Sequence, residues 1–254
     1  MDLFLKEPNL PQLSVSVAAV SEAAPALHDA LKRRGIRVLP VQAAAQMAPP
    51  VASHADMHLL MLDGQTALVS PHQPKLADDL RQLGITVLVG QALGEVYPTD
   101  VAYNVAIIGN YYICNVHTIS ETAHRWLTAH GLQPIHTRQG YSKCSVCVVS
   151  PNAIITADCS ITGAARAAGL DVLQIRAGHI RIPVYDTGFI GGCCGKLAPD
   201  QMGFCGDVDT HPDAAAIRNF LQQHGVQTIC LCDGPLTDIG GIIPVMVSAD
   251  KTSS

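Results

Sequence analysis

Polar and titratable side chains stand at the start of several short apolar runs. In His54-Ala55-Asp56-Met57-His58, three titratable groups alternate with apolar ones directly before a run that begins at Leu59. If this segment is the start of a strand, its alternate residues share one face. A carboxylate beside an imidazole can orient a cationic ligand and move its protons. The corresponding positions before other runs hold Asn104, Lys143-Cys144, Gly191-Gly192-Cys193, and Asp238 with Gly240-Gly241.

Two cysteines, Cys144 and Cys193, are candidate nucleophiles, because a thiolate attacks electron-poor carbon. Lys143 precedes Cys144, and an ammonium group turned toward that thiol would lower its pKa. Cys193 lies among glycines, where tight packing explains it equally well. We therefore predict Cys144 as the nucleophile and His54 as the proton carrier. The predicted substrate ligands are Asp56, Asn104, Lys143, Gly192, Cys193 and Asp238.

The segment 207–213 is rich in Asp, Thr and His and precedes a predicted helix. His211 in this segment is a candidate general acid or base. A helix cap formed by Thr210 or His211 explains the same composition.

Several common motifs fail on inspection of the residues. The glycine-rich stretch 188–196 has Ile190 where a Walker A loop needs glycine, and Leu197 where it needs Ser or Thr. The dinucleotide glycine pattern is absent there as well. Cys144 and Cys147 have the spacing of a metal knuckle, but no second pair accompanies them. We predict neither a cofactor nor a bound metal.

The elements that must position these residues recur along the chain. An amphipathic helical pattern, a glycine and an apolar strand follow one another five times, in 21–39, 75–89, 120–135, 161–175 and 212–232. The glycines that end the helices are 49, 47, 38 and 56 residues apart, which is the spacing of a repeat protein. They are Gly35, Gly84, Gly131, Gly169 and Gly225.

Paired strands are predicted between the helices. Residues 54–70, 104–115, 142–158 and 189–207 each contain two apolar runs around a turn signal, such as Asp63-Gly64 or Pro151-Asn152. A fifth pair is predicted from 226–232 and 239–244, around Asp233-Gly234-Pro235. If the units surround an axis, the polar residues at their strand starts meet in one central cavity.

The composition is that of a globular protein: 254 residues, 48% hydrophobic and 15% charged. We expect a single domain over 1–254, with a short lead-in at 1–13 and a frayed tail at 248–254. A net charge of −5 argues against nucleic-acid binding. The sequence contains neither a secretory leader pattern nor an apolar run long enough for a membrane, so we expect a cytoplasmic protein. Nine cysteines without a leader predict reduced thiols.

Five hairpin-plus-helix units with polar strand starts resemble the pentein, or guanidino-group-modifying, superfamily. The segments GFIGGCCGKLAPDQMGFCGD (188–207) and DIGGIIP (238–244) are similar to an uncharacterised bacterial branch of it. The resemblance implies an α/β five-bladed propeller, as in deiminases, dimethylarginine hydrolases and amidinotransferases. It also implies a thiolate from the last repeat, a proton-carrying histidine, and carboxylates that hold the guanidinium. The last repeat here has Gly240-Gly241 followed by Ile242, and no cysteine at that point.

These observations predict a small-molecule hydrolase or transferase that acts on an amidine or guanidino carbon–nitrogen bond in a central pocket. The nucleophile would be relocated to Cys144 or Cys193, or replaced by water activated by His and Asp. The alternative is a catalytically inactive pentein that acts as a binding protein. The sequence gives no indication of an oligomer.

Overall fold

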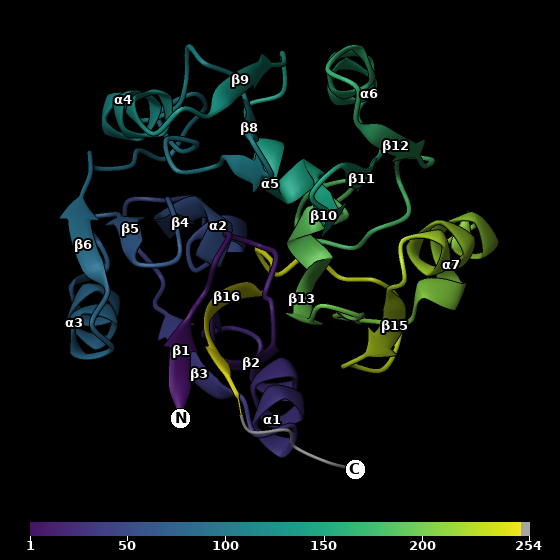
Figure 1. Ribbon diagram of the computed structural model, residues 1–254, viewed down its shortest axis with the longest axis horizontal. Coiled ribbons are helices and arrows are strands. Elements are labelled where there is room, and N and C mark those ends of the chain that lie inside the picture. Colours follow the sequence, from purple (N-terminus) through teal and green to yellow (C-terminus); the bar gives the residue numbers. More distant parts are fainter. Residues whose placement is uncertain (250–254) are drawn as a thin grey trace.

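Five small β-sheets surround a common centre, and a helix lies on the outside of each (Figure 1). The computed structural model describes residues 1–249. The outer helices are α1 (Pro25–Arg33), α3 (Pro74–Gln82), α4 (Glu121–Ala129), α6 (Cys159–Ala167) and α7 (Ala214–Gln223). This is the predicted propeller of hairpin-plus-helix repeats.

Four of the sheets have the same topology. An antiparallel hairpin is followed by a helix, and the strand after the helix pairs in parallel with the second hairpin strand. A helix is the usual crossover between parallel neighbours, because their ends lie far apart. The strands are β4 (Leu59–Met61), β5 (Thr66–Val69) and β6 (Thr86–Val89); β7 (Ala106–Ile108), β8 (Tyr111–Cys114) and β9 (Gln133–His136); β10 (Cys147–Ser150), β11 (Ala153–Thr156) and β12 (Asp171–Gln174); β13 (Cys194–Ala198), β14 (Gln201–Phe204) and β15 (Gln227–Cys230).

The remaining sheet joins the two ends of the chain. Its order is β1 (Asp2–Phe4), β16 (Ile243–Ser248), β2 (Ser14–Ser21) and β3 (Arg37–Val41). β16 pairs antiparallel with β2, so the hairpin of this unit is made from strands that are far apart in sequence. The predicted hairpin between 226–232 and 239–244 is therefore wrong. β15 stays in the last sheet beside β14, and the chain then crosses to the first sheet.

The predicted helix-ending glycines are confirmed. Gly35 has φ of 74°, a left-handed conformation in which a side chain is strained. Its N–H donates to the carbonyl of Lys32, and the N–H of Ile36 donates to that of Leu31, which together form a Schellman cap. The same pair of bonds and a positive φ recur at Gly84, Gly131, Gly169 and Gly225.

Each outer helix buries its apolar stripe against the sheets. In α1, Leu27 and Leu31 are fully buried and pack in one cluster with Val20 and Ile36. Burial of such a side chain contributes about 1.5–3 kcal/mol. The apolar positions that the sequence places at helical spacing are thus the positions that hold the units together.

Three segments expected to be strand starts are single helical turns. They are α2 (Ala55–His58), α5 (Ser142–Ser145) and a 3₁₀ turn at Gly191–Cys193. His54, Asp56 and His58 therefore do not share a strand face. A backbone bond from Met57 N–H to the His54 carbonyl closes the turn instead. Alternation over only five residues is too short to distinguish a strand from a helical turn.

The chain ends differ in part from the expected lead-in and tail. The lead-in contains β1, and the expected tail begins at Ser248, which is the last residue of β16. Residues 250–254 of that tail lie outside the described residues. Within residues 1–249, no helix has the length and apolar character needed to cross a bilayer.

Candidate functional site

The short segments that precede the inner strands of the five units meet at the centre of the ring. Asn104 connects three of these segments. Its Nδ2 donates to the carbonyl of Asp56 (3.2 Å) and to Sγ of Cys144 (3.0 Å). Its Oδ1 accepts from the backbone N–H groups of Lys143 (2.7 Å) and Cys144 (3.1 Å). Asn104 thus fixes the turn α5 and the direction of the Cys144 side chain.

The glycine pair of the last unit completes this centre. The carbonyl of Gly240 accepts from the Asp56 N–H (3.1 Å), and the carbonyl of Gly192 accepts from the Gly241 N–H (2.7 Å). Gly240 has φ of 79°, and a Cβ there would lie 2.4 Å from Cα of His54. Only glycine fits at position 240. The last unit therefore brings main-chain atoms, and not a thiol, next to His54 and Asp56.

Asp238 is buried and held by backbone donors. Its carboxylate accepts from the N–H groups of Phe189 (2.9 Å) and Gly240 (3.0 Å). A Cβ on Gly192 would lie 2.0 Å from its Oδ1, so Gly192 is the residue that makes room for the carboxylate. Burial raises the pKa of Asp238 from 3.8 to about 6, an effect that His54 opposes. Oδ1 lies 3.7 Å from Nδ1 of His54, close enough for attraction but too far for a hydrogen bond.

Asp56 is a second buried carboxylate, and it is fully shielded from solvent. Within residues 1–249, neither of its carboxylate oxygens accepts from a nitrogen or oxygen donor, and the thiol of Cys144 is the side-chain donor directed to it. Buried carboxylates are normally paired, because their desolvation is costly. Within residues 1–249, Asp56 has no such charged partner, and its negative charge acts on Cys144 and Asp238 at the centre of the ring.

Cys144 is a buried, neutral thiol in this state. Burial and the negative charges of Asp56 and Asp238 raise its pKa well above the ordinary value. The lowering of this pKa by Lys143 depended on the ammonium group turning toward the thiol, and Lys143 is not among the groups that act on Cys144 here. The Lys143 side chain lines a small gap on the other side of the turn, where its charge acts on Cys147 and Cys193.

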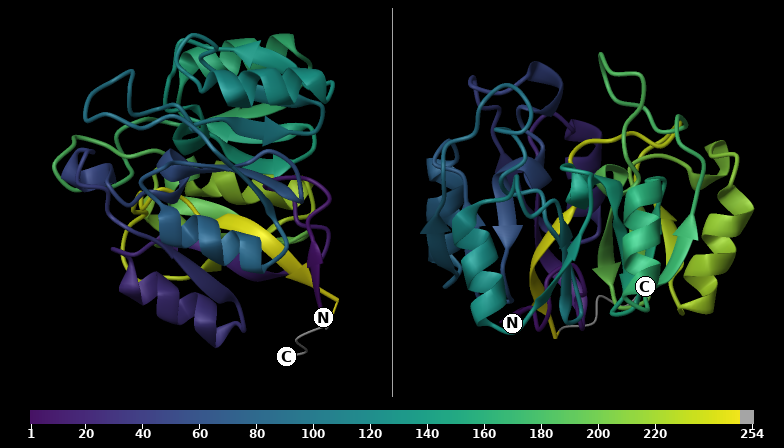
Figure 2. Two further views of the ribbon diagram at one scale, coloured as in Figure 1. Left: turned by 90° about the vertical axis from the view of Figure 1, so that its left-hand side faces the viewer. Right: turned by 90° about the horizontal axis from the view of Figure 1, so that it is seen from above.

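A cavity of about 200 Å³ opens above this cluster. His54, Cys144 and Asp238 are its chemically active lining. Part of its cover comes from residues 175–190, the segment after β12, which extends to the same end of the molecule as residues 49–51 (Figure 2). The other lining residues are Val51, Met57, Tyr141, Ile182, Tyr185, Thr187 and Phe189.

The aromatic part of this lining was not predicted from the sequence. The rings of Tyr141 and Phe189 lie 6.1 Å apart at 22°, and the Tyr141 hydroxyl donates to Asp100 (2.6 Å). Tyr141 directly precedes α5, so its proximity to Cys144 in sequence was an available signal. Tyr185 and Ile182 lie in an irregular segment, where no periodicity marks a residue as part of a site.

Some predicted site residues lie outside the cavity. Cys193 is fully buried, and its thiol donates to the Ile190 carbonyl (3.1 Å). His211 packs against His179, and its Nδ1 accepts from the N–H of Asp213 (3.0 Å), directly before α7. The N-cap of α7 is Asp213, which makes no side-chain capping bond, so neither Thr210 nor His211 is the cap residue that the sequence suggested. His211 instead holds the N–H of that N-cap residue. Lys143, Cys193 and His211 are therefore not brought together with the lining thiol.

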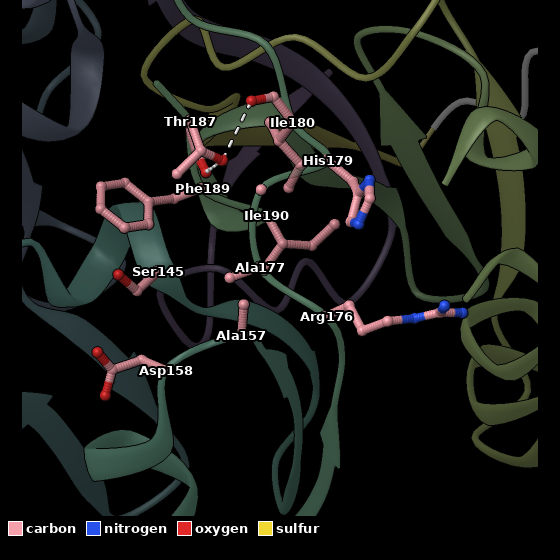
Figure 3. A pocket seen from close by; sticks show the side chains of 12 residues that line it. Ser145, Ala157, Asp158, Arg176, Ala177, His179, Ile180, Thr187, Phe189 and Ile190 are labelled. Atoms are coloured by element: carbon pink, nitrogen blue, oxygen red, sulfur yellow. Dashed lines mark hydrogen bonds between the residues drawn. The ribbon is translucent and has the colours of Figure 1, made fainter. Parts of the chain in front are cut away.

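Figure 3 shows a second cavity of about 120 Å³, which shares Thr187 and Phe189 with the first. Several of its polar side chains already have structural partners. The Thr187 hydroxyl donates to backbone carbonyls, Arg176 is paired with Asp213, and Asp158 caps α6. Among the described residues, its lining holds the Ser145 hydroxyl but no thiol, and its one carboxylate, Asp158, is used to cap α6. The central cavity, with a thiol, an imidazole and a carboxylate, is the better candidate site.

Solved structures share the architecture. Inosamine-phosphate amidinotransferase StrB1 from Streptomyces griseus aligns with a TM-score of 0.58 at 12% identity, over 100% of this chain and 97% of that one. SxtG, an amidinotransferase of the saxitoxin pathway from Microseira wollei, gives 0.57 at 10% identity, over 100% and 98%. DDAH from Pseudomonas aeruginosa, in complex with citrulline, gives 0.54 at 11% identity, over 93% and 99%. The chain has the pentein fold.

The sequence also matches a family over most of its length. Residues 19–243 match DUF6873, a family of unknown function, and the chain belongs to it. No curated protein sequence matches the chain. The family membership agrees with the resemblance to an uncharacterised pentein branch.

Proposed function

We propose that the protein is an enzyme that breaks a carbon–nitrogen bond of an amidine or guanidine, as a hydrolase or an amidinotransferase. The observation that carries the proposal is the joint presence of a thiol, an imidazole and a buried carboxylate, Cys144, His54 and Asp238, on one cavity. The shared fold with two amidinotransferases and DDAH supports the same class of chemistry.

The charge of the site favours a cation. Asp238 faces the cavity, and Asp56 adds a second negative charge beside Cys144, where no cationic side chain within residues 1–249 offsets it. An amidinium group spreads one positive charge over two N–H donors and matches a carboxylate in two hydrogen bonds. We assign Asp238 as the acceptor for the amidinium and Asp56 as the charge that strengthens its attraction.

Cation binding also activates the nucleophile. The two carboxylates hold the Cys144 thiol protonated in the free enzyme. A bound amidinium offsets both negative charges, so the pKa of Cys144 falls when substrate arrives. The thiolate then forms only in the presence of the carbon it attacks, which protects a buried cysteine from other reactions.

The proton and bond changes follow from this arrangement. His54 takes the Cys144 proton, and the sulfur attacks the central amidine carbon to give a tetrahedral adduct. His54 returns the proton to the departing nitrogen, which leaves as the amine when the carbon–nitrogen bond breaks. A guanidine then leaves an S-linked amidinium on Cys144, and an amidine leaves a protonated thioimidate. Water attack completes a hydrolysis, whereas attack by an amine completes a transfer, and each releases the thiol. Asn104 keeps the sulfur in place through its 3.0 Å contact.

Variants at the cavity test this assignment. Turnover of a panel of amidines and guanidines is measured as amine release, and binding by calorimetry. Cys144→Ser should abolish turnover and retain binding, and His54→Ala should slow turnover by about 10²–10⁴-fold. Asp238→Asn should weaken binding by more than about tenfold, because a charge-assisted hydrogen bond contributes about 1.5–3 kcal/mol. Cys193→Ala removes the other candidate thiol and should leave both properties intact.

These results distinguish the enzyme from the catalytically inactive binding protein. Full turnover by Cys144→Ser would remove Cys144 from the mechanism. Binding that depends on Asp238, without turnover of any panel member by the wild type, would favour the binding protein over the enzyme.

A further inference from the structure

We propose that the cavity selects amidines or guanidines whose remaining part is apolar and uncharged, and that it discriminates against guanidines that carry a carboxylate. The inference rests on the proposed function and names its substrate class. It follows from the lining of the cavity, in which the charged and titratable groups lie at one end and the remaining walls are largely apolar.

The walls above the reactive cluster offer apolar surface. Val51, Met57 and Ile182 contribute aliphatic groups or a thioether, and the rings of Tyr141 and Phe189 lie side by side. Aromatic and aliphatic walls of this kind bind apolar and ring-shaped groups.

The hydroxyl groups in these walls are mostly occupied. The Tyr141 hydroxyl donates to Asp100, and the Thr187 hydroxyl donates to the carbonyl of Gly188 (3.1 Å). Only Tyr185, about half exposed at 48%, has a hydroxyl with no such bond to the described residues. The upper cavity therefore has few donors for an anionic group of a ligand.

No cationic side chain replaces those donors. Among the described residues that line the cavity, none is a lysine or an arginine. The one ionisable nitrogen is on His54, which lies beside Asp238 at the end that receives the amidinium. Arg181 does not line the cavity; it lines an adjoining outer groove with Asp186, and that groove shares Ile182 and Tyr185 with the cavity. A ligand carboxylate would lose its water without gaining a charged partner, which is costly.

The size of the cavity narrows the class further. About 200 Å³ is below the roughly 300 Å³ at which pockets for drug-sized ligands begin. A single ring or a short alkyl chain attached to the amidine is the appropriate size. Benzamidine is a simple probe of this class, and 4-carboxybenzamidine differs from it by one carboxylate.

The test compares these two probes by calorimetry on the full chain near neutral pH. Benzamidine should bind at least about tenfold more tightly than 4-carboxybenzamidine, because the added carboxylate is desolvated without a partner. Phe189→Leu should weaken benzamidine binding several-fold, since it removes part of the aromatic wall. Phe220→Leu in α7 and Arg181→Ala in the outer groove are the matched controls, and neither substitution should change the affinity for benzamidine.

The possible results are distinct. Equal or tighter binding of 4-carboxybenzamidine, lost in Asp238→Asn, overturns the selectivity but keeps the amidine site. Binding of neither probe overturns the selectivity and the proposed function together. A preference for benzamidine that Asp238→Asn leaves unchanged also refutes the proposal, because the probe would then bind elsewhere.

Discussion

Replacing Asp238 with Asn should change how the stability of the protein depends on pH. The folded state raises the pKa of Asp238 from 3.8 to about 6, chiefly through burial. A shift of roughly two units corresponds to about 3 kcal/mol. Because the folded pKa is the higher one, this stability is fully present below about pH 4, where Asp238 is protonated. It is lost as the pH rises through about 6.

The measurement is urea unfolding of the wild type and Asp238→Asn at a series of pH values. Between about pH 4.5 and 7.5, the unfolding free energy of the wild type should fall by about 2 kcal/mol relative to the variant. The hydrogen bonds that Asn cannot replace add a constant offset that does not depend on pH. Comparing the two proteins also cancels every other titrating group that the substitution leaves unaltered.

Asp213 provides a control of opposite sign. Its hydrogen bonds with Arg176 lower its pKa to about 2, so its contribution is present at neutral pH and lost as the pH falls. The difference between wild type and Asp213→Asn should therefore grow with pH, though weakly, since this ion pair is partly exposed. A wild-type-minus-Asp238→Asn difference that stays flat across the range would refute the argument that Asp238 titrates in a buried site.

Three further predictions concern the same centre. Benzamidine binding to the wild type should weaken by up to about tenfold per pH unit below 6, as protons compete for Asp238, and calorimetry that finds no such loss would exclude Asp238 as the acceptor. Gly240→Ala should lower the unfolding free energy by more than about 2 kcal/mol, because its φ is positive and its Cβ meets His54. Gly163→Ala in α6, where a Cβ meets nothing within 4 Å, should instead raise it by about 0.5–1 kcal/mol, and equal effects in urea unfolding would contradict the reasoning. Asn104→Ala should lower kcat more than it raises KM, since Asn104 positions Cys144 without lining the cavity, and a change in KM alone would assign it to substrate binding.

The features predictable from the sequence are those that a few neighbouring residues determine. Gly35 and its four counterparts end helices because a left-handed conformation excludes other side chains. Asp63 marks the turn between β4 and β5 because its side chain accepts from the N–H groups of Gln65 and Thr66, which is also a local effect. The repeat then implied that polar strand starts would meet, which is where Asn104, Cys144 and Asp238 lie.

The features that could not be predicted depend on distant parts of the chain. β16 pairs with β2, a partner more than 200 residues away, and nothing near Ile243 in the sequence specifies it. The direction of the Lys143 side chain is set by packing against other units, so adjacency to Cys144 was misleading. Ile182 and Tyr185 join the cavity through an irregular segment, and such segments have no period from which burial can be inferred.

Covalent labelling with chloroacetamidine tests the central claim most directly. The reagent carries an amidinium and loses chloride to a thiolate, so it combines the proposed recognition with the proposed nucleophile. The neutral chloroacetamide is the matched reagent, and the exposed Cys159 and Cys230 are internal comparators. Peptide mass mapping should show one amidine adduct on Cys144, formed faster than the amide adduct, absent in Cys144→Ser and slowed in Asp238→Asn. Labelling confined to Cys159 and Cys230, at rates that Asp238→Asn does not change, would contradict the account.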